Sequence, residues 1–169
     1  MKKFKIFLAG HSNSKKHEFV EAKINQKFDK DRLCKLGKDE VFEDYQNCRF
    51  TIFDLNEQER YNSPDAKTIK IADGFLVVFS VYDKDTFNNL VSKWLESFDM
   101  NKDLSKAPVV LVGIKDDDQK EKAIKKEEVE KLEIATKFKM PYFETTINRA
   151  DSEHVLKTLY DTILKNNQN

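Results

Sequence analysis

The sequence predicts an α/β fold, a three-layer, doubly wound arrangement around a mostly parallel six-stranded sheet with one antiparallel strand. Three observations support this prediction. Apolar runs alternate with segments of helical periodicity, which favours parallel strands joined by helices. The runs 74–81 and 109–112 are continuously apolar, as expected of strands buried on both faces. Two alternating segments flank Gln46-Asn47 and predict an antiparallel hairpin.

The expected elements follow in chain order. A first strand over 4–9 ends at Gly10, and a polar helix follows over 16–27. The hairpin pairs strands 41–45 and 49–53, and a short strand is expected at Tyr142-Phe143. Apolar residues at helical spacing predict three further helices. These residues are Phe87, Leu90, Val91, Trp94, Leu95 and Phe98, then Val129, Leu132, Ala135 and Phe138, and finally Val155, Leu156, Leu159, Tyr160 and Ile163.

Composition narrows the class of protein. The 169 residues, 39% of them hydrophobic, are enough for one domain over 1–169 with a buried core. Thirty Lys and Arg balance thirty Asp and Glu, so no net charge favours nucleic acid or an anionic membrane. Cys34 and Cys48 form no close metal-type pair and fit a reduced intracellular protein better than a disulfide. No stretch is long enough to span a bilayer.

Ligands of doubly wound folds bind at the carboxyl ends of the strands, which directs attention to four loops. The loop after Ala9 runs from Gly10 to His17 and matches part of the phosphate-binding pattern G-x-x-x-x-G-K-[ST]. Gly10 and Lys16 match, whereas Lys15 replaces the second glycine and His17 the hydroxyl residue. Taken alone, this loop fits a polar strand-to-helix turn better than a phosphate site.

The other three loops resemble the motifs of Ras-like small GTPases. The segment 53–61 resembles D-T-A-G-Q-E, the segment 112–117 resembles the guanine-reading N-K-x-D, and the segment 143–148 resembles E-T-S-A-K. The resemblance covers the chain from about residue 4 to 164. The matching residues are Asp54, Gln58 and Glu59 in the first segment, Lys115 and Asp117 in the second, and Glu144 and Thr145 in the third.

This resemblance implies a role for each matching position. The predicted phosphate-binding residues are Gly10, Asn13, Ser14, Lys15, Lys16 and His17. The predicted switch residues are Asp54, Glu57, Gln58 and Glu59, with Gln58 as the residue that would orient a catalytic water. The predicted base-binding residues are Phe28, Lys115, Asp117, Thr146 and Ile147. GTP or GDP is the implied ligand.

Several departures from the family pattern weaken this site. At Lys15 a Cβ replaces glycine, which costs about 1 kcal/mol or more if the backbone needs φ > 0. His17 offers an imidazole where Mg²⁺ requires a hard oxygen. No Ser or Thr occurs between Phe28 and Asn47, where the family places its second hydroxyl ligand. Glu57 would repel a γ-phosphate. We therefore expect no metal site, weak nucleotide binding at most and little hydrolysis.

Three functions remain open on the sequence. The first is a GTPase-fold protein kept for signalling or interaction, in effect a pseudo-GTPase. The second is a divergent but functional small GTPase that hydrolyses GTP slowly. The third is a flavodoxin-like α/β binding domain. For the first, the expected partner is a protein effector or regulator, without nucleic acid and without a membrane anchor in this chain. We expect a cytoplasmic monomer, which would be membrane-peripheral if a lipidated tail followed.

Overall fold

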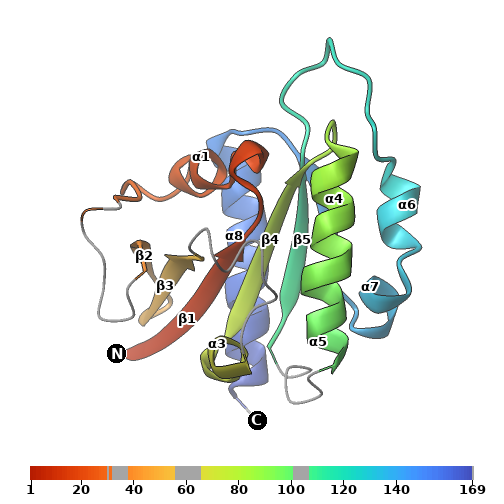
Figure 1. The fold of residues 1–169 in the computed structure, drawn as a ribbon. Coiled ribbons are helices and arrows are strands. Elements are labelled where there is room, and N and C mark those ends of the chain that lie inside the picture. The colour runs from red at the N-terminus through yellow and green to blue at the C-terminus, as the bar shows by residue number, and fades with distance from the viewer. Residues whose placement is uncertain (30, 32–37, 56–65, 101–106, 169) are drawn as a thin grey trace.

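A six-stranded sheet forms the centre of the structure, a computed structural model that describes residues 1–29, 31, 38–55, 66–100 and 107–168 (Figure 1). The strand order is β2-β3-β1-β4-β5-β6. Only β2 runs antiparallel to its neighbour among these six strands, so the predicted mostly parallel sheet is confirmed. The strands are β1 Lys2–Ala9, β2 Glu40–Tyr45, β3 Cys48–Asp54, β4 Gly74–Ser80, β5 Val109–Ile114 and β6 Tyr142–Thr145.

The hairpin between β2 and β3 has the predicted two-residue turn. Gln46 and Asn47 both have positive φ, at 49° and 61°. A tight turn with φ > 0 at both central residues matches the right-handed twist of the strands that it joins. The turn sets the register, in which Tyr45 faces Cys48 and Val41 faces Ile52.

Helices cover both faces of the sheet and give three layers. On one face, α1 (Lys16–Glu21) and α8 (Arg149–Asn166) pack against alternate residues of β1 and β3. On the other face lie α3 (Ala66–Ile71), α4 (Lys84–Leu90), the π-helical turn η2 (Val91–Leu95), α6 (Lys126–Glu130) and α7 (Glu133–Lys137). A last segment, α5 (Glu96–Met100), continues the helix of α4 and η2 (Figure 1).

Two helices differ from the predicted ranges, and a third was not predicted. The first ends at Glu21 rather than near residue 27, because neighbouring side chains bind elsewhere: Gln26 accepts from the Phe42 N–H and Lys23 pairs with Glu43. The helix expected over 129–138 is two short helices, with extended backbone at Leu132, φ −59° and ψ 123°. The sequence patterns did not predict α3.

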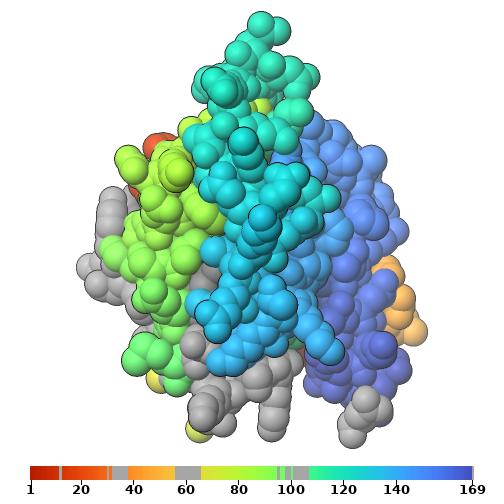
Figure 2. Space-filling model, turned by 90° about the vertical axis from the view of Figure 1, so that its right-hand side faces the viewer, coloured from red at the N-terminus to blue at the C-terminus, as the bar shows by residue number. Residues whose placement is uncertain are grey.

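The parallel strands end together at the upper edge of the sheet in Figure 1. Leu8 aligns with Asp54 and with Leu76, and Ile114 aligns with Ser80 and Thr145. The loops after β1, β5 and β6 are therefore neighbours. The loop between β5 and α6 projects beyond the rest of the surface, as Figure 2 shows.

Candidate functional site

The loop after β1 is shaped by Gly10. Its φ is 149°, and a Cβ there would lie 2.3 Å from the Val78 carbonyl oxygen, so only glycine fits. The chain then makes a short 3₁₀ turn over Ser12–Ser14, where the Ser14 hydroxyl donates to the His11 carbonyl at 2.6 Å. This turn delivers the chain to the first residue of α1.

Lys15 stands just before α1 with a left-handed backbone, φ 60° and ψ 32°. This is the conformation for which the phosphate-loop pattern uses glycine, and a side chain there costs roughly 1–2 kcal/mol. The Lys15 ammonium crosses to the loop after β5 and pairs with the Asp116 carboxylate. Both residues line an open cavity of about 660 Å³ that extends from the phosphate loop to the loops after β4 and β5.

Lys16, the first residue of α1, points into the molecule and pairs with Asp54 at the end of β3. Both side chains are buried, at 3% and 6% exposed. His17 Nε2 lies 2.9 Å from the other oxygen of Asp54, close enough for an ion pair but not aligned as a hydrogen bond. Burial alone would raise the pKa of Asp54, but contact with His17 and Lys16 outweighs burial and lowers it. Asp54 is thus a buried carboxylate between the Lys16 ammonium and the His17 imidazole.

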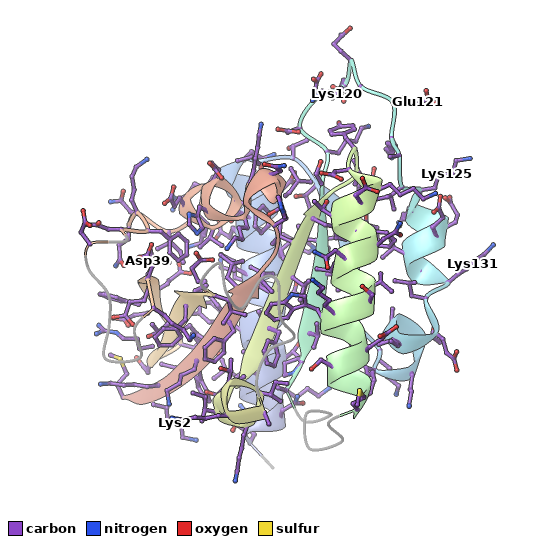
Figure 3. All side chains as sticks on the ribbon, in the orientation of Figure 1. Lys2, Asp39, Lys120, Glu121, Lys125 and Lys131 are labelled. Carbon is purple, nitrogen blue, oxygen red and sulfur yellow. The ribbon has the colours of Figure 1, made fainter. Side chains whose placement is uncertain are left out.

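Phe28 stacks on the other side of His17. The ring centroids are 4.4 Å apart and the planes differ by 21°. The Phe28 N–H donates to Glu21 Oε1 at 2.9 Å, and the next N–H, of Asp29, donates to Asp39 Oδ1 at 2.7 Å. Asp39, labelled in Figure 3, also accepts the Asp54 N–H on its carbonyl at 2.8 Å. These contacts join the segment after α1 to the strand that carries Asp54.

The residues around Asp54 do not fit Mg²⁺. A magnesium ion takes hard oxygen ligands in near-octahedral geometry. Here the position after Lys16 offers an imidazole, and both oxygens of Asp54 contact protein side chains, one the Lys16 ammonium and the other the His17 imidazole. Within the described ranges no group of three His, Cys, Asp or Glu side chains is arranged to hold a metal.

Four of the five predicted base-binding residues follow β5 and β6, whereas Phe28 lies after α1 against His17. Lys115 donates its N–H to the Thr145 carbonyl at 2.7 Å. The Asp117 backbone is held by Tyr82, whose hydroxyl donates to the Asp117 carbonyl at 2.6 Å and accepts its N–H at 3.1 Å. The Asp117 carboxylate accepts from the Gln119 N–H at 3.0 Å.

The loop after β6 is fixed at the start of α8. Thr146 donates its N–H and its hydroxyl to Asp151, at 3.3 and 3.1 Å, and Asn148 caps the helix. Ile147 packs on the sheet face that α1 and α8 cover. Hydrogen bonds within the protein therefore fix the loops after β5 and β6, which carry four of the predicted base-binding residues.

Most predicted site residues come together at this end of the sheet. The predicted switch residues Glu57, Gln58 and Glu59 lie outside the described residues. Two residues of this end escaped the sequence patterns, Tyr82 and Asp116. Tyr82 lies two residues beyond the end of the buried strand β4, and its hydroxyl reaches the loop after β5. Asp116 is one of three consecutive aspartates, and nothing in that run indicates that it pairs with a lysine 101 residues away.

This fold and the order of its loops define an α/β protein of the small-GTPase class. The chain belongs to the Ras family, because the Ras family model matches residues 5–168. Among the described helices, none has the length and apolar character needed to cross a membrane.

Individual relatives agree with the family assignment. The chain is 32% identical to the mouse Ras-related protein Rab-27A over 121 residues, which are 71% of this chain and 53% of the relative. It is 32% identical to the human Ras-related protein Rab-27B over 117 residues, 68% of this chain and 51% of the relative. The Ras-related protein RabO of Dictyostelium discoideum matches at 29% over 161 residues, 85% of this chain and 73% of the relative. The chain thus spans about half the length of the Rab-27 relatives.

Proposed function

We propose that this protein is a small-GTPase-fold signalling or interaction protein that binds GTP or GDP weakly or not at all and hydrolyses little GTP. One observation supports this most strongly. The phosphate-loop lysine, Lys16, and the residue after it, His17, are both held by the buried carboxylate of Asp54.

The Lys16–Asp54 pair opposes phosphate binding. To reach a phosphate, the Lys16 ammonium must leave the buried Asp54 carboxylate. Removing one partner of a buried ion pair costs about 3–5 kcal/mol, because the other charge stays buried without compensation. A phosphate must offset this cost before any net affinity appears.

Hydrolysis requires more than phosphate contact. The developing charge of phosphoryl transfer is normally neutralised by a metal ion and fixed donors. The donor set near Asp54 does not suit magnesium, and Glu57 adds a negative charge to the segment expected near the γ-phosphate. Gln58 could orient a water, but orientation alone does not replace the missing electrostatic stabilisation.

We further propose that the chain acts through a protein effector or regulator. Its balanced charge gives no reason to expect nucleic acid. We expect a monomer in the cytoplasm, or at a membrane surface if a lipidated tail follows this chain.

A divergent, working GTPase is the second candidate. It is favoured by the loop after β5, where the Tyr82 hydroxyl fixes the backbone of Asp117, the residue predicted to read the guanine. Such an ordered loop is what recognition of a guanine would need.

Nucleotide content separates the two candidates. Pure protein is denatured, and the supernatant is chromatographed for guanine nucleotides. We expect far less than one equivalent per chain and a GTP turnover equal to the buffer blank. A sample preloaded with equimolar GDP checks recovery. One equivalent of GDP, together with measurable turnover, would favour the working GTPase.

A further inference from the structure

The ion pair between Lys15 and Asp116 is a feature of this chain that the proposed function does not use. Lys15 belongs to the phosphate loop and Asp116 to the loop after β5, and the two are 101 residues apart in the sequence. Both line the same open cavity of about 660 Å³. The pair therefore links the loop after β1 to the loop after β5 along the lining of this cavity.

The charges around Lys15 are mainly negative. Its hydrogen bond with Asp116 holds the pKa of Lys15 above the ordinary value, and Glu18 and Asp117 contribute in the same direction. The ammonium is therefore firmly charged, yet it faces carboxylates of the chain itself. An incoming anion would meet this lysine with its charge already compensated.

This pair differs from the buried one at Lys16. The Lys15 side chain is 54% exposed and that of Asp116 is 20% exposed, whereas Lys16 and Asp54 are almost fully buried. Ion pairs between exposed groups are weak and exchange partners readily. A phosphate that approaches through the cavity can therefore replace Asp116 as the partner of Lys15 without leaving a buried charge.

We propose that Asp116 is an internal competitor for the phosphate groups of a nucleotide: its carboxylate occupies Lys15, and a diphosphate must displace it. This inference rests on the proposed nucleotide site and adds a mechanism for its weak binding. The exchange requires only the Lys15 side chain to change its partner, since the ammonium lies at the end of a long, half-exposed side chain.

The test compares GDP affinities by calorimetry for the wild type and Asp116→Asn. Release of Lys15 from its carboxylate should strengthen GDP binding about fivefold, the factor that corresponds to about 1 kcal/mol for a charge pair near 4 Å in water. Guanosine, which has no phosphate, should bind equally to both proteins.

The matched control is Asp118→Asn. Its carboxylate belongs to the same loop but is 88% exposed and lies 3.8 Å from Lys115, not at Lys15. This variant removes the same charge and should change GDP affinity less than twofold. In a Lys15→Gln background, Asp116→Asn should bring no further gain. Thermal unfolding checks that each variant is folded.

Three results would overturn the proposal. They are a gain for Asp116→Asn no larger than that for Asp118→Asn, a gain that persists without Lys15, and an absence of GDP binding in both the wild type and Asp116→Asn. The proposed function fails separately, if the wild type itself binds GDP tightly. In that case the affinity ratio between the variants still decides whether Asp116 competes with phosphate.

Discussion

At the scale of single residues, Asp54 organises the site. It is the last residue of β3, so the strand fixes its backbone, and Lys16 and His17 reach it from the first turn of α1. The Lys16 ammonium and the His17 imidazole both lie against its carboxylate. Both carboxylate oxygens are thereby engaged by protein side chains, which is the physical reason to expect that any nucleotide binding does not depend on magnesium.

The lowered pKa of Asp54 gives a prediction about acid stability. A carboxylate with a depressed pKa stabilises the fold above its unfolded pKa, and this contribution is lost as pH falls through the folded pKa. We expect the free energy of unfolding, measured with urea, to decrease as the pH is lowered from about 4.

The variant Asp54→Asn provides the comparison. It should lose about 3 kcal/mol at pH 7, because Lys16 keeps a buried charge without its carboxylate. Its stability should then depend less on pH below 4 than that of the wild type. The exposed Asp118→Asn should follow the wild-type curve. An equally steep acid transition in Asp54→Asn would contradict the assignment.

Several single-residue features could be predicted from the sequence. Motif order placed Lys15, Lys16, His17 and Asp54 at one end of the sheet, since strand ends of a parallel sheet meet there. The partners could not be predicted: Lys15 pairs with Asp116, and Phe28 stacks on His17. Such pairs join residues that are distant in the chain, and local periodicity carries no information about them.

At the scale of elements, strands were easier to predict than helices. The strands are continuous apolar or alternating runs bounded by turn residues. Helix ends depend on tertiary contacts: α1 stops where Lys23 and Gln26 bind β2, and the break between α6 and α7 falls at Leu132. The apolar positions 129, 132, 135 and 138 keep helical spacing across that break, so the pattern alone suggests one helix.

The pairing of β5 with β6 depends on a glycine. A Cβ at Gly113 would lie 2.2 Å from the Tyr142 hydroxyl oxygen, which is buried and has no hydrogen-bond partner in the described part of the chain. Gly113→Ala should therefore lower the free energy of unfolding by about 1–3 kcal/mol through overpacking.

Tyr142→Phe supplies the control for this contact. The loss of an unsatisfied hydroxyl should be nearly neutral on its own. Combined with Gly113→Ala, it should recover most of the lost stability, as measured by chemical unfolding. Additive losses in the double variant would show that the alanine is disfavoured for another reason.

At the scale of the whole molecule, the chain has the scaffold of the Ras family. The two buried clusters on the sheet faces keep the strand ends in place. The overall architecture followed from the alternation of apolar runs and helical segments. A flavodoxin-like alternative is no longer needed, because the antiparallel β2 lies at the sheet edge and the Ras family model matches almost the whole chain.

The proposed loss of phosphate and metal contacts is local to the loop after β1, so we expect two substitutions to reverse part of it. The substitution Lys15→Gly removes the backbone strain of a left-handed lysine, and His17→Ser places a hydroxyl next to Lys16. The double variant should bind GDP more tightly than the wild type and respond to Mg²⁺, because phosphate and metal contacts both improve.

Guanosine binding serves as the control for this repair and should change little. Hydrolysis should stay poor, since the segment between Phe28 and Asn47 still has no Ser or Thr and Glu57 remains. Binding isotherms decide the outcome, with circular dichroism to check the fold. A well-folded double variant without any gain would mean that the loop after β1 is not a phosphate site.

The magnesium dependence of GDP binding tests the central claim most directly. Fluorescent GDP is titrated into the wild-type protein with Mg²⁺ and again with a chelator. Because His17 and Lys16 contact the Asp54 carboxylate, we predict that the two affinities agree within about twofold, less than 0.5 kcal/mol. A loss of affinity of about tenfold or more on chelation, equivalent to about 1.4 kcal/mol, would contradict the account.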